Sequence, residues 1–183
     1  MNALRVLLSR EQIASRVAEM GKQITADSSG ESVIFVGVLK GAAIFLSDLV
    51  RTMNVDSTFE FIAVASYGTP APDNRRAWDS TGVVRLAKDV DQPLRGKNVV
   101  LVEDILDTGL TLTFLKRLLL GHEPKTLRVA VLLDKPSRRK LAISADYVGF
   151  TIPDEFVVGY GMDYAERYRN LPDICVLPEV SPS

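Results

Sequence analysis

Two adjacent carboxylates, Glu103 and Asp104, stand between an aliphatic run and a turn rich in Asp, Thr and Gly. The run at 99–102 (VVLV) predicts a buried parallel strand, and the apolar pattern at 112–120 predicts a helix that is ended by Gly121. A strand, a loop and a helix N-terminus in this order form an anion site, because the first N–H groups of the helix are free and its dipole is positive there. The chemistry indicated first is therefore the binding of a phosphate.

The turn itself carries groups that suit a phosphate. Thr108 and Thr111 offer hydroxyl donors, and Gly109 allows the backbone to approach an anion closely. The turn lacks the lysine of the G-x-x-x-x-G-K-[ST] pattern, which disfavours a nucleoside triphosphatase. Carboxylates repel a phosphate, so Glu103 and Asp104 need another partner, and a ribose diol or Mg²⁺ would provide one. These groups together predict a ribose-phosphate ligand, and the alternative is a capped turn with solvated acids.

The segment VLVEDILDTGLTL resembles the phosphoribosyl-diphosphate (PRPP) signature of type I phosphoribosyltransferases. Only Leu110 departs from the signature, where relatives often carry a polar residue, and a backbone N–H at that position would make its side chain unimportant. The resemblance implies that Glu103 and Asp104 hold the ribose diol and Mg²⁺. It implies that the turn binds the 5′-phosphate through Asp107, Thr108, Gly109, Leu110 and Thr111. Asp107 is also the candidate general base for the proton that leaves N7 of a purine.

A second candidate anion site lies at Lys40, which follows the predicted strand 33–38 and precedes Gly41. Open α/β sheets bind ligands at the carboxyl ends of their strands, and a lysine beside exposed backbone suits an anion there. The alternative is a surface lysine at the start of a helix. The segment LKGA resembles the pyrophosphate-binding loop of the purine members of the family, which implies a non-proline cis peptide bond before Lys40.

Lys135 stands at the carboxyl end of another predicted strand, 126–133. Its ammonium has donors and no acceptor, so it would recognise a carbonyl oxygen and would gain nothing from an amino group. This favours a 6-oxopurine over adenine. The segment DKPSRR resembles the corresponding segment of hypoxanthine-guanine phosphoribosyltransferases. We expect Arg138 and Arg139 at the surface or in subunit contacts.

The C-terminal part contains the segment IPDEFVVGYGMDYAERYRNLPDI, which resembles the base-binding and closing segment of the same enzymes. The resemblance implies that Phe156 stacks on the base and that Val157 pairs with its edge. It places Asp163 near the base and the metal, and it implies that Arg169 reaches the pyrophosphate. From the residues alone, Phe156 would be an ordinary core residue of a strand, and Arg169 a surface charge at a helix end.

The stretch at about 66–82 is long and rich in Pro, Gly and polar residues. Loops of this length inside a compact domain are usually lids or disordered segments. Ser66 and Tyr67 resemble one end of the family's flexible catalytic loop, and a lid would keep a sugar cation away from water. The alternative is a hairpin tip without a role.

Composition bounds the remaining possibilities. The chain has 183 residues, enough for one domain with a full core, and its formal charge of −1 indicates neither a nucleic-acid nor a membrane surface. No apolar run approaches the ~18 residues of a membrane span. Cys175 lies alone in an apolar stretch, which predicts a buried thiol in a reducing, cytoplasmic setting. His122 is the single histidine, so any metal must be bound by oxygen ligands such as carboxylates.

The elements that must position these groups follow one pattern. A capping box at Ser9–Gln12 predicts a first helix that ends at 28–30, and strands then alternate with helices. We expect the type I phosphoribosyltransferase fold, an α/β fold with a mostly parallel central sheet flanked by helices. A single domain, 1–183, would carry a small hood formed mainly by about 146–183.

The activity implied by the resemblance is purine salvage. A Mg²⁺-dependent enzyme would transfer the phosphoribosyl group of PRPP to N9 of hypoxanthine or guanine, with xanthine as a further candidate, and release pyrophosphate. The resemblance also suggests a homodimer or homotetramer. Two alternatives are a nucleic-acid-binding regulator that keeps the PRPP fold and a pyrimidine-specific transferase. The near-zero net charge disfavours the first, and Lys135 disfavours the second.

Overall fold

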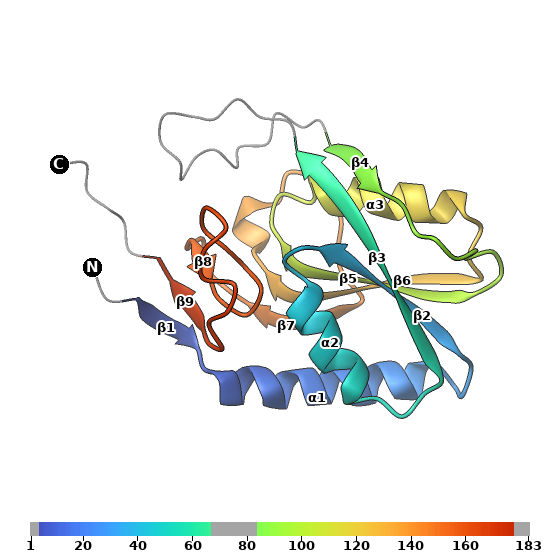
Figure 1. The fold of residues 1–183 in the computed structure, drawn as a ribbon, viewed down its shortest axis with the longest axis horizontal. Helices are drawn as coiled ribbons and strands as arrows, with labels where there is room; N and C mark the ends of the chain where they lie inside the picture. Colours follow the sequence, from blue (N-terminus) through green and yellow to red (C-terminus); the bar gives the residue numbers. More distant parts are fainter. Residues whose placement is uncertain (1–3, 67–83, 178–183) are drawn as a thin grey trace.

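The computed structural model describes residues 4–66 and 84–177, and its strands and helices alternate along the chain (Figure 1). The helices are α1 (Arg10–Asp27), α2 (Ala43–Arg51) and α3 (Leu110–Gly121), with a short 3₁₀ helix at Pro136–Arg138. The strands of the larger sheet are β2 (Val33–Leu39), β3 (Ser57–Ser66), β4 (Val84–Lys88), β5 (Asn98–Leu106), β6 (Thr126–Asp134) and β7 (Tyr147–Thr151). The strands of a smaller sheet are β1 (Arg5–Leu8), β8 (Val157–Val158) and β9 (Ile174–Val176).

The larger sheet has the strand order β4-β3-β2-β5-β6-β7. Its neighbouring strands pair in parallel, except that β4 pairs antiparallel with β3. The carboxyl ends of β2, β5 and β6 therefore lie at one edge, which is where open α/β sheets bind ligands. The expected mostly parallel α/β architecture is confirmed.

Helices cover both faces of the larger sheet (Figure 1). Because side chains alternate along a strand, Phe35, Val100 and Ala130 pack with α1 and α2 on one face. Val36, Leu101 and Val129 pack with α3 on the other face. The strands are thus buried on both sides, which explains why their sequences are almost continuously apolar.

The predicted helix starts and stops agree with the structure to within a residue or two. Ser9 caps α1 with the reciprocal Ser9–Gln12 bonds of a capping box, as the sequence predicts. Gly121 is the last residue of α3 rather than the first residue beyond it, and His122 occupies the C-cap. Cys175 is 5% exposed, so the prediction of a buried thiol is confirmed.

The smaller sheet differs from the expected hood in its composition. Its middle strand, β9, pairs antiparallel with β8 and with β1, which comes from the N-terminus. β7 lies within the expected hood segment 146–183 but belongs to the larger sheet. The N-terminal residues 5–8 gave no strong strand signal, because a short edge strand is defined by its pairing partner more than by its own pattern.

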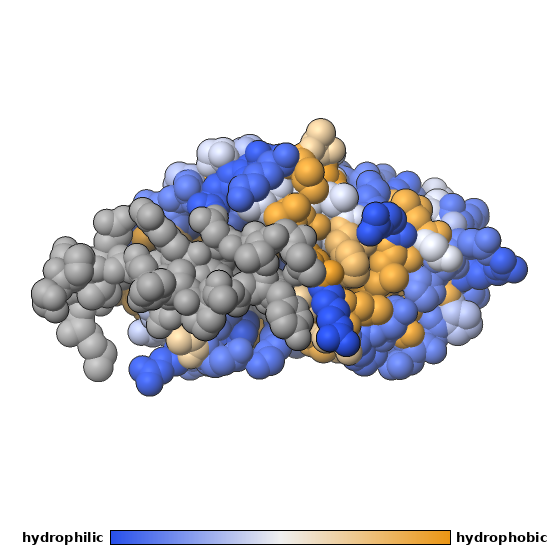
Figure 2. Space-filling view, turned by 90° about the horizontal axis from the view of Figure 1, so that it is seen from above, coloured by the Kyte–Doolittle hydropathy of each residue, from blue (hydrophilic) through white to orange (hydrophobic). Residues whose placement is uncertain are grey.

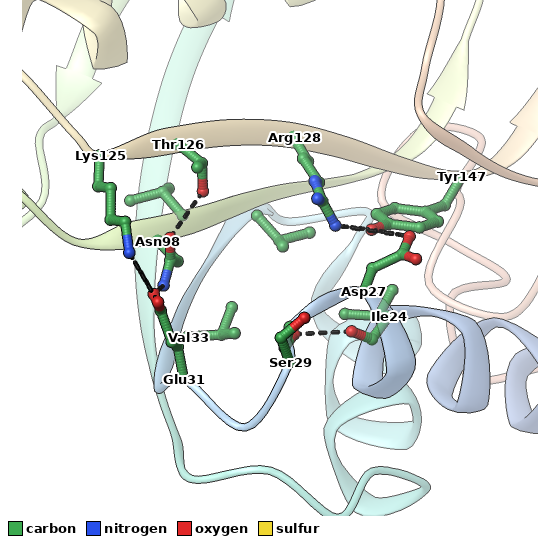
Figure 3. A pocket seen from close by; sticks show the side chains of 13 residues that line it. Ile24, Asp27, Ser29, Glu31, Val33, Asn98, Lys125, Thr126, Arg128 and Tyr147 are labelled. Atoms are coloured by element: carbon green, nitrogen blue, oxygen red, sulfur yellow. Dashed lines mark hydrogen bonds and ion pairs between the residues drawn. The ribbon is translucent and has the colours of Figure 1, made fainter.

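Two surface features lie away from the ligand-binding edge. Apolar side chains gather over β4 and α3 (Figure 2), where Leu86, Phe114 and Leu118 pack partly buried on the core. A hollow of about 190 Å³ lies at the amino ends of β2, β5 and β6 (Figure 3). Its polar side chains bond one another, for example Lys125 with Glu31 at 2.6 Å. It lies at the edge opposite to the one where such sheets bind ligands.

Candidate active site

The turn predicted to bind phosphate lies between β5 and α3. Gly109 caps α3 with φ of 87°, and a Cβ atom on it would lie 2.6 Å from Ile143 Cγ2, so glycine is required for both conformation and space. Gly109 has no side chain with which to cap α3, and the first turn of the helix holds no acidic residue, but the N–H of Leu110 donates to Oγ1 of Thr108 at 3.4 Å. The positive end of the helix dipole is not compensated by a carboxylate there, which suits an anion.

The acid pair lies inside β5 and not after it, which corrects the expectation from the sequence. β5 stays paired with β6 as far as Leu106, so the ladder hydrogen bonds extend past the carboxylates. Glu103 is 8% exposed, and its Oε2 atom is buried without a hydrogen-bond partner among the described residues. Burial, reinforced by the neighbouring Asp104, raises the pKa of Glu103 well above its usual range.

Asp104 is partly exposed, whereas Glu103 is buried. Its Oδ1 accepts a hydrogen bond from the backbone N–H of Ile105 at 2.7 Å. Burial raises the pKa of Asp104, and the positive charge of Arg169 acts in the opposite direction. An unpartnered buried carboxylate oxygen beside a second carboxylate suits a ligand that brings hydroxyl donors or a divalent cation.

The loop after β2 contacts the acid pair. The peptide bond between Leu39 and Lys40 is cis, as the family resemblance implied. A Cβ atom on Gly41 would lie 1.7 Å from Oδ2 of Asp104, and one on Gly161 would lie 2.2 Å from the carbonyl oxygen of Gly41. Three segments far apart in the sequence therefore meet around the Gly41 backbone.

Arg169 reaches this place from the C-terminal segment. It does not end a helix; its NH1 donates to the carbonyl oxygen of Gly161 at 2.8 Å, and its NH2 lies 2.8 Å from Oδ1 of Asp163. Oε2 of Glu166 lies 3.4 Å from NH2 of Arg169 and 3.0 Å from Nζ of Lys40. The structure thus brings together the two cations, Lys40 and Arg169, that the sequence assigned to one ligand.

Lys135 is buried directly after the end of β6. Its side chain points to the C-terminal segment, where Nζ donates to the carbonyl oxygen of Glu155 at 2.6 Å. Desolvation lowers the pKa of Lys135, although nearby carboxylates, Asp107 first among them, act to raise it. One of its donors is occupied by Glu155, which leaves donors for a ligand.

The two residues assigned to the base follow Glu155 directly. The Phe156 ring is half-buried and meets the Tyr164 ring edge to face, with 5.8 Å between centroids. Val157 is buried and pairs with Val176 in the smaller sheet. Phe156 lies just before β8, so this short strand holds both residues near Lys135.

Within the chain, Arg138 and Arg139 contact the turn that begins at Asp107, which the sequence did not predict. The expected subunit contact of these arginines stays a prediction. Arg138 Nε donates to Oδ1 of Asp107 at 2.7 Å, and its NH1 contacts Asp154 at 3.5 Å. Arg139 donates to the carbonyl oxygens of Leu106 and Asp107 and pairs with Asp134.

Sequence reasoning missed these loop contacts, and it missed Gly161 and Glu166. The DKPSRR segment did contain a signal for the arginines, because two cations follow closely on a strand that ends beside β5. Gly161 has φ of 99°, a conformation that favours glycine, but nothing local in the sequence indicates that its neighbour is Gly41.

Parts of the predicted site lie beyond the described residues. Ser66 is the last residue of β3 and pairs with Val84, whereas Tyr67 and the rest of the expected lid to 82 lie outside the described residues. Within residues 4–66 and 84–177, no group of three or more His, Cys, Asp or Glu residues is arranged to hold a metal ion. Both oxygens of Asp163 already have partners, Arg169 and the N–H of Glu166. In the same described ranges, no helix is long and apolar enough to cross a membrane.

Comparisons with known proteins define the class to which this fold and site belong. Residues 6–165 match the phosphoribosyl transferase domain, and the chain therefore belongs to the phosphoribosyltransferase family. It is 43% identical over 175 residues to the hypoxanthine phosphoribosyltransferase of Escherichia coli (strain K12), with 94% of each protein covered. It is 49% identical to a hypoxanthine-guanine phosphoribosyltransferase of Bacillus anthracis whose crystal structure matches with a TM-score of 0.87, over 94% of this chain and 98% of that one.

A longer relative is also similar. The chain is 43% identical over 177 residues to the bifunctional protein TilS/HprT of Listeria innocua, a match that includes 96% of this chain. The match spans 26% of the length of that protein.

Proposed function

We propose that this protein transfers the phosphoribosyl group of PRPP to N9 of hypoxanthine or guanine, giving IMP or GMP and pyrophosphate in purine salvage. The observation that carries the proposal is the contact between Gly41 and Asp104, which joins a candidate pyrophosphate loop to a candidate ribose site. Relatives named for hypoxanthine and guanine, at 43–49% identity over nearly the whole chain, support the choice of base.

PRPP would bind along the carboxyl edge of the sheet. The 5′-phosphate is bound by the α3 N-terminus and the turn before it, through Asp107, Thr108, Gly109, Leu110 and Thr111. Glu103 and Asp104 accept hydrogen bonds from the ribose hydroxyls, which supply the partner that Oε2 of Glu103 lacks among the described residues. Lys40, the backbone at Gly41 and Arg169 bind the pyrophosphate.

The base would lie between the phosphate loop and the C-terminal segment. Lys135 donates to the 6-oxo group while it retains its bond to the carbonyl of Glu155. Phe156 stacks on the purine ring, and the backbone of Val157 pairs with its edge. Asp163 lies beside the base on the side of Arg169.

The chemical step breaks the bond between C1′ and the pyrophosphate oxygen and forms the bond between C1′ and purine N9. As the first bond loosens, the ribose gains oxocarbenium character, as in glycoside cleavage. Lys40 and Arg169 stabilise the electron pair that leaves with pyrophosphate. Asp107 accepts the proton from N7, and Arg138 orients its carboxylate through Oδ1.

The acid pair fits a magnesium ion, because Mg²⁺ is typically held by one or two carboxylates together with substrate oxygens. Glu103 and Asp104 would hold it, with Asp163 as a further proposed ligand, and Mg²⁺ would supply charge neutralisation at the pyrophosphate. We also propose that the protein acts as a homodimer or homotetramer in the cytoplasm.

The test is mononucleotide formation from PRPP with guanine, hypoxanthine, xanthine, adenine or uracil, with Mg²⁺ and after chelation. We expect turnover of guanine and hypoxanthine, loss of turnover on chelation and recovery when Mg²⁺ is added back. Turnover of uracil alone would show that Lys135 does not read a 6-oxopurine. Absence of turnover with every base would contradict the enzymatic proposal and favour a regulator with the same fold.

A further inference from the structure

One carboxylate oxygen occupies the space between the two cations of the proposed pyrophosphate site. Oε2 of Glu166 lies 3.0 Å from Nζ of Lys40 and 3.4 Å from NH2 of Arg169. Lys40 and Glu166 are 126 positions apart in the sequence, so this bridge joins the loop after β2 to the C-terminal segment. An anionic oxygen shared by a lysine and an arginine is the arrangement that a phosphate oxygen would also make.

The backbone around Glu166 directs its side chain toward these cations. Glu166 has φ of 62°, and its N–H donates to Oδ2 of Asp163 at 2.8 Å. The turn is closed by backbone bonds between Tyr164 and Arg167 in both directions. Asp163 therefore fixes the turn, and the Glu166 side chain projects from it to Lys40.

The bridge is accessible to solvent, which distinguishes it from the other contacts of Arg169. The side chains of Lys40 and Glu166 are 65% and 66% exposed, whereas Asp163 is 14% exposed. Ion pairs between exposed side chains are weak, so an incoming polyanion can replace Glu166 without disturbing the buried Asp163–Arg169 pair.

We infer that Glu166 is a displaceable internal anion of the pyrophosphate site, and that it weakens the binding of both PRPP and the product pyrophosphate. This inference rests on the proposed function, because it takes Lys40 and Arg169 as the pyrophosphate ligands. Each binding event must break the contacts of Glu166, and each release of pyrophosphate restores them. The residue thus limits inhibition by the product and raises the concentration of PRPP that the enzyme needs.

The experiment is calorimetric titration of the full-length protein with inorganic pyrophosphate in Mg²⁺ buffer. Glu166→Gln removes the charge, and Glu166→Asp keeps the charge but shortens the side chain by one methylene. Glu31→Gln is the matched control, since Glu31 is also an exposed glutamate paired with a lysine, Lys125, but lies at the opposite edge of the sheet. Thermal unfolding establishes that each variant is folded.

We expect the Kd of pyrophosphate to fall roughly three- to fivefold in Glu166→Gln, and less in Glu166→Asp, with no change in Glu31→Gln. The KM for PRPP should fall together with this Kd. The difference in the Kd of pyrophosphate between Glu166→Gln and the wild type should shrink as salt is raised from about 50 mM to about 500 mM, because salt screens exposed charges. A merely structural role for Glu166 would not tighten binding.

Three results would overturn the inference. Unchanged or weaker pyrophosphate binding in Glu166→Gln would mean that Glu166 does not compete with the ligand. Tightening in Glu166→Gln together with wild-type affinity in Glu166→Asp would indicate a long-range charge effect without displacement. If neither the wild type nor any variant binds pyrophosphate, Lys40 and Arg169 do not form a pyrophosphate site. A failure of the proposed function can be told apart from a failure of this inference. The proposed function is tested by nucleotide formation by the wild-type protein, whereas the inference is tested by the ratio of the pyrophosphate Kd values of the variants and the wild type.

Discussion

The Gly41 backbone lies so close to the Asp104 carboxylate that a Cβ atom on Gly41 would be 1.7 Å from Oδ2 of Asp104. β2 and β5 are neighbours in the sheet and run parallel, so the loop that follows β2 lies beside Asp104 near the carboxyl end of β5. The backbone of Gly161, in the C-terminal segment, packs against the carbonyl oxygen of Gly41. The position of one carboxylate is therefore coupled to the backbone of the proposed pyrophosphate loop.

Replacing Gly41 by alanine should disturb the contact between the Gly41 backbone and the Asp104 carboxylate. The added methyl group must displace the Asp104 carboxylate or move the loop, and misplacement of a reacting group by about 1 Å can lower a rate about a hundredfold. We expect Gly41→Ala to lower kcat/KM for PRPP by about that factor while the protein stays folded. Gly121→Ala is the control, because no atom of the described residues lies within 4 Å of a Cβ atom there and alanine favours the helix. Wild-type activity in Gly41→Ala would show that this contact does not matter.

Replacing Asp107 by asparagine tests the general base. The asparagine side chain would keep the shape of the original and could still accept the hydrogen bond from Arg138, but it could not take the N7 proton. Since general-base catalysis typically contributes about 10²–10⁴-fold, kcat should fall by at least about a hundredfold while the KM for PRPP changes little. Asp154→Asn, at a second carboxylate that Arg138 contacts, should change kcat far less. Normal turnover in Asp107→Asn would exclude this assignment.

Replacing Lys135 by methionine tests recognition of the 6-oxo group. Methionine preserves most of the packing at this buried position but removes the donors, so a 6-oxopurine would lose one hydrogen bond from a charged group. We expect kcat/KM for hypoxanthine to fall about tenfold or more, and the preference over adenine to narrow. Initial rates with the two bases measure both effects. Lys22→Met, at an exposed position of α1, serves as the control, and an unchanged base preference in Lys135→Met would refute the role of Lys135.

The free energy of unfolding should depend on pH through the contact between Arg10, at the start of α1, and Asp173, just before β9. Asp173 accepts hydrogen bonds from the backbone N–H of Arg10 at 2.8 Å and from its guanidinium at 3.1 and 3.2 Å. These bonds lower the pKa of Asp173 in the folded protein. Because the folded pKa lies below the unfolded value of about 3.9, this stabilisation is fully present above that value and is lost as pH falls through the folded pKa.

Denaturant unfolding at several pH values measures this effect. Asp173→Asn should have a lower free energy of unfolding than the wild type near neutral pH. The difference in the free energy of unfolding between the two proteins should shrink in the acid range. Asp91→Asn is the control, since the Asp91 side chain is 79% exposed and pairs with a residue of its own segment, Lys88. If the difference in the free energy of unfolding between Asp173→Asn and the wild type stays constant down to the lowest pH, Asp173 does not stabilise the folded protein through a lowered pKa.

Local patterns predicted much of the fold. The capping box at Ser9 fixed the start of α1, because capping bonds join residues only three apart. The continuous apolar runs predicted strands buried on both faces, and the pairing of β2, β5 and β6 agrees with this. The same reasoning ended the β5 strand too early, at Val102, since carboxylates are rare in buried strands and usually mark a strand end.

The pairing partners of short or polar segments could not be predicted in this way. β1 was missed because β9, the strand it pairs with, lies near the other end of the chain. Arg138 and Arg139 were expected at the surface or in subunit contacts, and only the side-by-side arrangement of β5 and β6 shows why they also contact the turn that begins at Asp107.

The sequence by itself determined which chemical groups this protein carries and the order in which they come along the chain at or near strand ends: Lys40, the Glu103–Asp104 pair, the turn at 107–111, and Lys135. Each of these depends on spacing within one strand–loop–helix unit, which local periodicity specifies. The tertiary structure alone decided that Gly41 lies against Asp104 and that Glu166 lies between Lys40 and Arg169. Such contacts join segments far apart in the sequence, and their formation depends on the packing of the whole sheet and of the C-terminal segment over it.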